Sequence, residues 1–264
     1  MSRRFDAVVG YLQYVSLTQS KFHIHSPFVF DFYANVLMNA GTRSHYRVID
    51  RIRKELETVP RYIKRKDFGS KEKDFPSDQR FVRVRDVAVR TSVNRKKGEF
   101  LFRLIRRYHL DNILELGTSL GISTIYLGLA APAGKILTLE GCIDSANLAT
   151  ENFEKAGLNH IRVITGTFEE KLAEAFTLMP EPDLIFIDGN HRKVPTLDYF
   201  EACLQHIRPD TVLVLDDIYW SAEMQQAWKI ICNHPRVKVT INLYQMGVVF
   251  FKEELSKENF ILHF

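Results

Sequence analysis

Hydrophobic positions after residue 110 come in short runs that alternate with stretches of helical periodicity. Five apolar runs predict buried strands, at 112–116, 135–140, 160–165, 183–187 and 211–215. The stretches between and after them predict helices, at 123–131, 145–156, 169–178, 194–206 and 222–232. Alternation of this kind predicts a parallel sheet with helices on both faces. Residues 238–244 and 247–252 then predict a final antiparallel hairpin.

The first third of the chain has a helical pattern instead. Apolar residues between Phe5 and Val15 recur at roughly helical spacing. Ser26 followed by Pro27 is a helix-start signal, because serine caps the first N–H groups and proline suits the first turn. That helix is expected to run to Met38. Two further helices are expected at 46–64 and 95–108, with a polar segment at 65–80 that predicts a mobile loop or linker.

These patterns predict an α/β fold with a Rossmann-like, doubly wound and mostly parallel sheet. A C-terminal antiparallel hairpin completes the sheet, and an N-terminal helical extension precedes it. We expect residues 1–80 to form the extension or a substrate lid, with a basic loop at 65–80. Residues 81–264 are expected to form the main domain.

Composition is that of an ordinary globular protein, with 45% hydrophobic and 26% charged residues in a chain of 264. The three cysteines (Cys142, Cys203 and Cys232) lack metal-type spacing, so we expect free thiols in a reducing compartment. Polar residues interrupt the N-terminus early, which argues against a signal peptide or a membrane span. The expected location is therefore the cytoplasm, with no membrane partner.

The net charge of +4 conceals a division along the chain. Residues 1–110 hold 24 Lys and Arg against 11 Asp and Glu, and the remainder hold 12 against 21. Such asymmetry is typical of a face that binds polyanions, or of a basic extension docked against an acidic domain. The second interpretation is favoured, because the basic part also carries many side chains suited to packing.

A glycine turn follows the first predicted strand, in the sequence Leu114-Glu115-Leu116-Gly117-Thr118-Ser119-Leu120-Gly121. Ligands of open α/β sheets bind beyond the carboxyl ends of the strands, and glycine lets the backbone approach them closely. The dinucleotide pattern would place a glycine where Ser119 stands. Taken alone, the turn could also be a tight connection without a ligand.

An acidic residue, Glu140, ends the second predicted strand, 23 residues after Gly117. A carboxylate at that place can accept hydrogen bonds from both hydroxyls of a ribose. An acidic strand end is often merely solvated, but its combination with the glycine turn points to a nucleoside-bearing cofactor.

From Leu114 to Ser123 the sequence resembles the class I S-adenosylmethionine-dependent methyltransferases, in particular the catechol-type O-methyltransferase branch. That branch carries the pattern LE-x-GT-x-x-G-x-S after its first strand, and the resemblance extends over roughly residues 90–250. It implies S-adenosylmethionine as the cofactor. The residues that it implies for binding are Ser92, Val93, Glu115, Gly117, Thr118, Ser119, Gly121, Ser123, Glu140, Gly141, Gly166, Thr167, Phe168 and Asp188.

Within that set, the resemblance implies a place for each part of the cofactor. Glu115 and Gly117 are expected to line its methionine end, with Ser92 and Val93 closing over the carboxylate. Glu140 is expected at the ribose, and the stretch from Gly166 to Phe168 at the adenine.

Acidic residues also end the fourth and fifth predicted strands. In the catechol-type branch, the residues at these positions bind a divalent cation. The resemblance therefore implies Asp188, Asp216 and Asp217 as ligands of Mg²⁺ or another divalent cation. His191 stands where the branch has a lysine base, and a histidine can accept a proton near neutral pH. Asp188 and His191 are thus the candidate catalytic residues. The alternative is that Asp188 only fixes hydrogen bonds of the cofactor or of its loop, Asp216 caps a turn and His191 is a hydrogen-bonded loop histidine.

The function expected from these features is methylation of a small-molecule hydroxyl. Two alternatives stay open: an RNA (tRNA) methyltransferase that uses the basic N-terminal region, and a non-catalytic binding protein on the same fold. Nucleic acid is not the favoured partner, because no RNA-binding module is recognisable. The acceptor, a homodimer and the role of the His23/His25 pair are left open.

Overall fold

The computed structural model describes residues 10–11, 14–19, 24–39, 41, 43–65 and 80–264. The chain divides into two compact units, one formed by residues 39–180 and the other by residues 1–38 together with 181–264. None of the helices in these described ranges is long and apolar enough to cross a membrane. The role of residues 1–80 as a substrate lid stays a prediction.

The unit of residues 39–180 begins with a 3₁₀ turn at Arg43–Tyr46 and helix α3 at Arg47–Thr58, which buries Ile49, Ile52 and Leu56. The prediction of a helix up to residue 64 was wrong over its last part. Pro60 has no N–H to donate and disfavours a helical conformation at the residue before it, so α3 stops at Thr58. The following residues form strand β1 (Tyr62–Arg65), which pairs antiparallel with β2 (Arg80–Arg83).

Two helices lead from this hairpin into the sheet of the unit, α4 (Val84–Thr91) and α5 (Arg95–Tyr108). Helix α5 has the predicted bounds. The Asn94 side chain caps it by accepting a hydrogen bond from the Lys97 N–H at 2.9 Å. A Cβ on Gly98 would lie 2.3 Å from the ring of Tyr126, so glycine is needed where α5 packs against α6.

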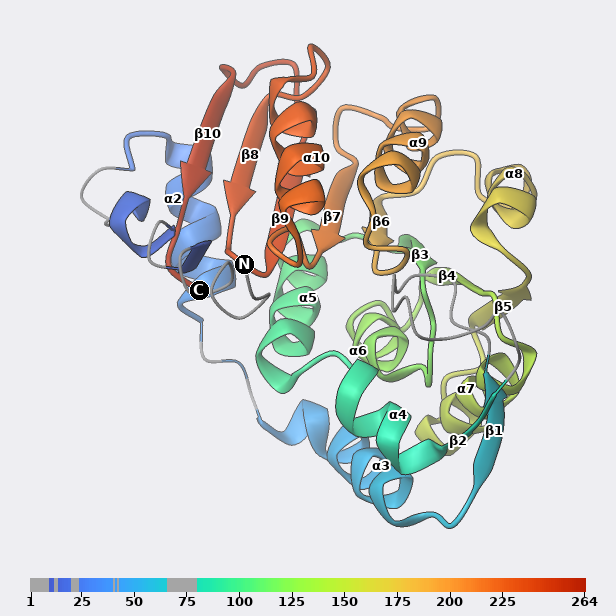
Figure 1. Cartoon of the computed structure of the whole chain (residues 1–264). Helices are drawn as coiled ribbons and strands as arrows, with labels where there is room; N and C mark the ends of the chain where they lie inside the picture. The colour runs from blue at the N-terminus through green and yellow to red at the C-terminus, as the bar shows by residue number, and fades with distance from the viewer. Residues whose placement is uncertain (1–9, 12–13, 20–23, 40, 42, 66–79) are drawn as a thin grey trace. The chain divides into compact units, whose positions relative to one another are not determined.

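Three parallel strands form the sheet of this unit, β3 (Asn112–Leu116), β4 (Lys135–Glu140) and β5 (Ile161–Thr165). They alternate with helices α6 (Ile122–Ala130), α7 (Ile143–Ala156) and α8 (Phe168–Leu178), which confirms the predicted pattern (Figure 1). Leu116 lies opposite Leu139, and Glu140 lies opposite Thr165. The turns after the three strands therefore come together at one edge of the sheet.

The other unit contains the parallel pair β6 (Leu184–Ile187) and β7 (Val212–Asp216), with helices α9 (Lys193–Leu204) and α10 (Ala222–Asn233). The predicted hairpin is confirmed as β8 (Val239–Asn242) and β9 (Met246–Phe250), and β9 also pairs antiparallel with β7. Strand β10 (Glu258–Ile261), parallel to β8, was not predicted. Its four residues include a single buried side chain, Phe260, which is too short a pattern to recognise.

The N-terminal residues of this unit pack on its C-terminal strands. Helix α2 (Pro27–Phe32) begins at the predicted cap, Ser26, and continues as a π-helix at Tyr33–Leu37. The rings of Phe28 and Phe32 meet the ring of Phe250 edge-on, at centroid distances of 4.9 and 6.0 Å. The Tyr14 hydroxyl donates to the Leu262 carbonyl at 2.5 Å. The extension is thus part of the core of this unit.

Candidate active site

The glycine turn between β3 and α6 has an unusual backbone. Gly117 and Gly121 take φ angles of 112° and 80°, and Ser119 takes 49°. A non-glycine residue in the left-handed region costs roughly 1–2 kcal/mol. Ser119, where the dinucleotide pattern has glycine, therefore adopts the conformation that glycine prefers. Strain of this kind is often found at functional turns.

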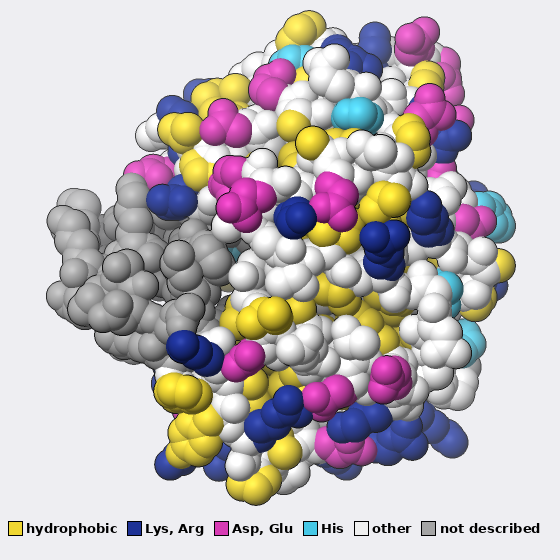
Figure 2. Space-filling view, turned by 90° about the vertical axis from the view of Figure 1, so that its right-hand side faces the viewer, with side chains coloured by type: hydrophobic (Ala, Val, Ile, Leu, Met, Phe, Trp, Pro, Cys, Tyr) yellow, Lys and Arg dark blue, Asp and Glu magenta, His cyan; other side chains and the backbone are white. Residues whose placement is uncertain are grey.

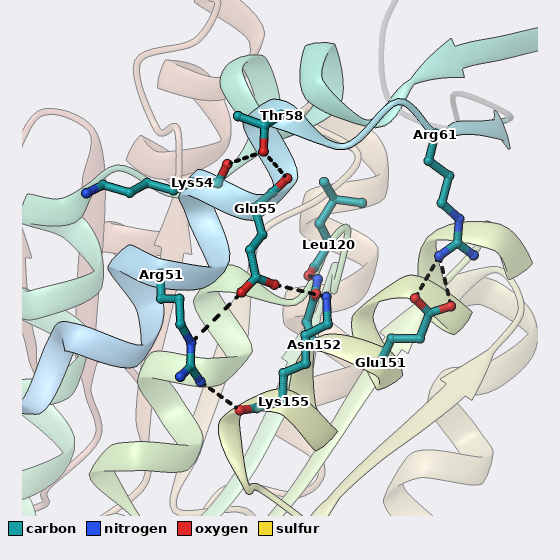
Figure 3. A network of polar contacts seen from close by, with 9 residues as sticks. All are labelled: Arg51, Lys54, Glu55, Thr58, Arg61, Leu120, Glu151, Asn152 and Lys155. Atoms are coloured by element: carbon teal, nitrogen blue, oxygen red, sulfur yellow. Dashed lines mark hydrogen bonds and ion pairs between the residues drawn. The ribbon is translucent and has the colours of Figure 1, made fainter.

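Residues of helix α7 pack against this turn and hold it in place. A Cβ on Gly121 would lie 2.5 Å from the ring of Phe153 on α7. Asn152, also on α7 and fully buried, donates from Nδ2 to the Leu120 carbonyl at 2.9 Å (Figure 3). The backbone N–H groups of Gly117 and Thr118 donate to the Leu139 carbonyl, which ties the turn to β4. Asn152 was missed in the sequence, because an asparagine within a helical pattern carries no sign of a distant partner.

Glu140, the predicted ribose ligand, is held in place by two backbone donors. Its Oε2 accepts the N–H of Ser119 at 2.7 Å, and its Oε1 accepts the N–H of Cys142 at 2.9 Å. The side chain remains partly exposed. A carboxylate can accept several hydrogen bonds, and these two backbone donors fix its orientation beside the glycine turn. The turn Glu140-Gly141-Cys142 thus links the acidic strand end directly to the glycine turn.

Glu115 lies inside the protein, with no exposed surface. Its Oε2 accepts the hydroxyls of Thr124 and Thr138, each at 2.6 Å, and Thr138 is also 2.6 Å from the Thr118 hydroxyl. Burial raises the pKa of the Glu115 carboxyl, and the threonine hydrogen bonds oppose that rise only in part. The network fixes the first turn of α6, where Ser123 is also buried. The expected contact of Glu115 with the methionine end stays a prediction.

The turn after β5 holds the residues expected at the adenine. Gly166 has a φ of 144°, and its N–H donates to the Glu140 carbonyl at 2.9 Å. Thr167 caps α8 in a reciprocal pair with Glu170, and Phe168 is half-buried in the first turn. The structure therefore brings this segment close to Glu140, and its expected contact with the adenine stays a prediction.

Two residues of α3 hold the segment that contains Ser92 and Val93. The Arg53 guanidinium donates to the Val93 carbonyl, and Arg95 forms an ion pair with Asp50 at 2.5 Å. Because Asp50 and Arg53 are three residues apart, they lie on the same side of the helix. Both were missed in the sequence, where the charged residues of 46–64 give only a helical pattern.

In the other unit, His191 lies between two of the predicted acidic residues. Its Nε2 is 3.9 Å from Asp188 Oδ1 and 3.9 Å from Asp217 Oδ2. Its ring centroid is 6.1 Å from that of Trp220. Asp217 has a positive φ of 53°, so the turn after β7, like the glycine turn, is strained.

Neighbouring residues fix the loop that carries His191. Asn190, with a φ of 52°, accepts from Arg192 Nε at 2.7 Å and donates to the Tyr199 hydroxyl at 2.9 Å. This loop therefore has a defined conformation that presents His191.

The three aspartates expected to bind a divalent cation are not arranged as a metal site. Asp216 ends β7 and is 5% exposed. In the part of the chain that the structure describes, no group of three or more His, Cys, Asp or Glu side chains is arranged to hold a metal ion. Asp188, Asp216 and Asp217 as they stand thus do not form a ligand set, and the cation stays a prediction that rests on the resemblance. Of the histidine pair, His25 is exposed and His23 lies outside the described residues.

Comparisons with known proteins find methyltransferases. The family model described as "Methyltransferase domain" matches residues 114–218. A catechol O-methyltransferase of Niastella koreensis is 37% identical over 130 residues, which make up 48% of this chain and 58% of that protein. The enzyme of the same name from Mycobacterium tuberculosis is 33% identical over 132 residues, or 49% and 58% of the two chains. The chain thus spans less than two thirds of the length of these relatives.

The likeness in structure extends over most of the chain. A crystal structure of an O-methyltransferase from Bacillus cereus in complex with SAH matches with a TM-score of 0.56 and 22% identity, covering 90% of this chain and 99% of that one. At this level of identity the match shows the fold, and the predicted fold class is confirmed. Residues 114–218 are similar to a methyltransferase domain, and the chain has the fold of an O-methyltransferase.

Proposed function

We propose that the chain binds S-adenosylmethionine and transfers its methyl group to a hydroxyl of a small molecule. The observation that carries the proposal is the Glu140 carboxylate, which two backbone N–H groups orient beside the glycine turn. The names of the two relatives, both catechol O-methyltransferases, support a hydroxyl as the acceptor group. On the resemblance, we propose that three further segments bind S-adenosylmethionine. They are the glycine turn, the pair Ser92 and Val93, and the stretch from Gly166 to Phe168.

When bound, the cofactor would supply a methyl group on a positively charged sulfur, and S-adenosylhomocysteine would leave as a neutral thioether when an acceptor oxygen displaces it in line. For this step the protein has to position the acceptor and take up its proton. We assign the proton to His191 Nε2. Asp188 and Asp217, each 3.9 Å from that nitrogen, would stabilise the imidazolium that forms.

The proposal is tested by calorimetry with S-adenosylmethionine. Glu140→Ala should weaken binding about tenfold or more, because the ribose loses a charged acceptor. Glu154→Ala, which removes an exposed carboxylate on α7, serves as the matched control and should leave the affinity unchanged. An unaltered affinity in Glu140→Ala, or no binding by the wild type, would contradict the cofactor assignment.

The transfer itself is tested with catechol as the acceptor. The expected result is formation of methylated catechol together with S-adenosylhomocysteine in equal amounts. A protein that binds the cofactor tightly and methylates neither catechol nor other small hydroxyl compounds would instead support the alternative of a non-catalytic binding protein.

A further inference from the structure

Apart from Arg53 and Arg95, which hold the segment of Ser92 and Val93, the basic side chains of the N-terminal part are given no role in the proposed methyl transfer. Residues 43–65 and 80–110 together carry 18 Lys and Arg against 5 Asp and Glu. The two strands of the hairpin contribute four of these basic residues and no acidic one, in the sequences Tyr-Ile-Lys-Arg for β1 and Arg-Phe-Val-Arg for β2.

Pairing of the two strands sorts their side chains onto two faces. Tyr62 lies opposite Arg83, and Lys64 lies opposite Phe81, so these four share one face of the ribbon. Phe81 is 73% exposed and Tyr62 is 53% exposed, and both cations are exposed as well. Ile63, on the opposite face, is buried. We call the set of Tyr62, Lys64, Phe81 and Arg83 the outer face of the ribbon.

The outer face repeats the same pair of chemical groups. Each of its two cross-strand pairs has one aromatic ring and one cation, and the pairs lie roughly 6.6 Å apart, two residues along a strand. The Arg83 Nε donates to the Tyr62 hydroxyl at 2.8 Å, and its guanidinium carbon is 5.7 Å from the centre of that ring. Figure 2 shows hydrophobic side chains with Lys and Arg side chains beside them at the lower left of the face in view.

The ribbon is fixed to α7 along β1. Arg61 binds both carboxylate oxygens of Glu151, at 2.9 and 2.7 Å (Figure 3). The backbone N–H of Lys64 donates to Asp144 Oδ2 at 2.7 Å, and its carbonyl accepts the Cys142 thiol at 3.1 Å. These contacts use the backbone of Lys64, so its side chain remains available on the outer face.

A partner for this face has to offer both flat aromatic surfaces and negative charge. Single-stranded nucleic acids do so, since their bases stack on aromatic rings while their phosphates contact lysine and arginine. An acidic peptide would neutralise the cations and leave the rings in water, and a duplex hides its base faces. We propose that the outer face of the ribbon binds single-stranded nucleic acid, an activity separate from the proposed methyl transfer.

The test is fluorescence anisotropy of the full chain with labelled oligouridine and oligothymidine of about 12 nucleotides. Phe81→Ala and Tyr62→Ala should each weaken binding about fivefold or more, because each base stacked on an aromatic ring contributes roughly 1–3 kcal/mol. Lys64→Glu should weaken binding and also flatten its salt dependence between roughly 50 and 200 mM. Ile230→Ala and Lys229→Glu, exposed positions on α10, are the matched controls. RNA and DNA arms show whether the 2′-hydroxyl contributes.

Three outcomes would overturn the proposal. They are equal affinities of Phe81→Ala and Ile230→Ala, equally tight binding of a duplex, and binding of anionic vesicles but not of the oligonucleotides. Circular dichroism and calorimetry with S-adenosylmethionine check that each variant folds. Since the nucleic-acid assay contains no methyl donor, a failure of the proposed function would leave its result intact.

Discussion

Among single residues, His191 has the most specific expected role in the reaction. Its Nε2 is 3.9 Å from each of two carboxylates, Asp188 and Asp217, which suits a group that becomes positively charged when it accepts a proton. In the sequence, this role was an expectation that rested on the resemblance alone. The two aspartates come from different loops, after β6 and β7, so their joint contact with His191 is a property of the fold.

Replacing His191 with glutamine should lower kcat about 100-fold or more, because proton transfer by a positioned side chain contributes roughly that much. The affinity for S-adenosylmethionine should not change, since the residue is not proposed to touch the donor. Single-turnover kinetics and calorimetry separate the two quantities. His206→Gln, in the turn after α9, is the control. Full activity of His191→Gln would remove it from the proposed mechanism.

Glu115 affects stability through its protonation state. Burial raises its pKa above the ordinary value of 4.5, so the native state holds the proton at a pH where the unfolded chain has lost it. Its favourable contribution is complete below pH 4.5 and is lost as the pH rises through the native pKa. Glu115→Gln keeps the acceptor for Thr124 and Thr138 and cannot ionise. Its stability relative to the wild type should therefore increase from pH 4 to pH 7.

Urea denaturation at several pH values measures this difference. Glu154→Gln, exposed on α7, should show a difference that is small at every pH. A constant difference between Glu115→Gln and the wild type would mean that Glu115 is not protonated preferentially in the native state.

Helix α7 illustrates how an element acts on the glycine turn. Ala149, Asn152 and Phe153 form the side of α7 that meets Leu120 and Gly121. The helical pattern of 145–156 predicted this helix, but only packing shows that its buried asparagine holds the turn.

Asn152→Leu keeps a side chain of similar size and leaves the Leu120 carbonyl without its donor. The cost of an unpaired buried carbonyl is about 1–3 kcal/mol, so the free energy of unfolding should fall by that amount. Affinity for S-adenosylmethionine should fall severalfold as well, because the turn is less well ordered. Chemical denaturation and calorimetry measure the two effects. Glu154→Ala, two residues along the helix, should show neither, and unchanged binding by Asn152→Leu would mean that the turn is held by other contacts.

For the molecule as a whole, the main expected effect of the N-terminal residues is on the stability of the fold. Val29, Phe32 and Val36 are fully buried, and Phe32 packs against Phe250 of β9. An extension that served only as a substrate lid would not need such contacts with a strand far along the chain.

Phe32→Ala should therefore reduce the free energy of unfolding by about 3–5 kcal/mol, as is usual for a phenylalanine in a core. Phe30→Ala, two residues earlier and 49% exposed, should cost much less. Denaturation in urea compares the two variants. Equal and small effects would show that α2 contributes little to the core and would return the N-terminus to the role of a lid.

The order of strands and helices from 112 to 250 was determined by the sequence alone, because buried strands and amphipathic helices have different hydrophobic periods. The glycine turn and Glu140 could also be identified from the sequence. The turn consists of residues that are close in sequence, and Glu140 is recognisable as the acidic last residue of a predicted strand. The hairpin of β1 and β2 and the strand β10 were not predicted, since four-residue strands carry too few positions to show a period.

Tertiary structure alone decided which distant residues support the site. Asn152 reaches Leu120, Arg53 reaches Val93, and Asp188 and Asp217 both approach His191. Each contact joins separate elements, and its direction depends on how those elements pack. A sequence pattern records the period and burial of one element at a time, so it contains no information about these pairings.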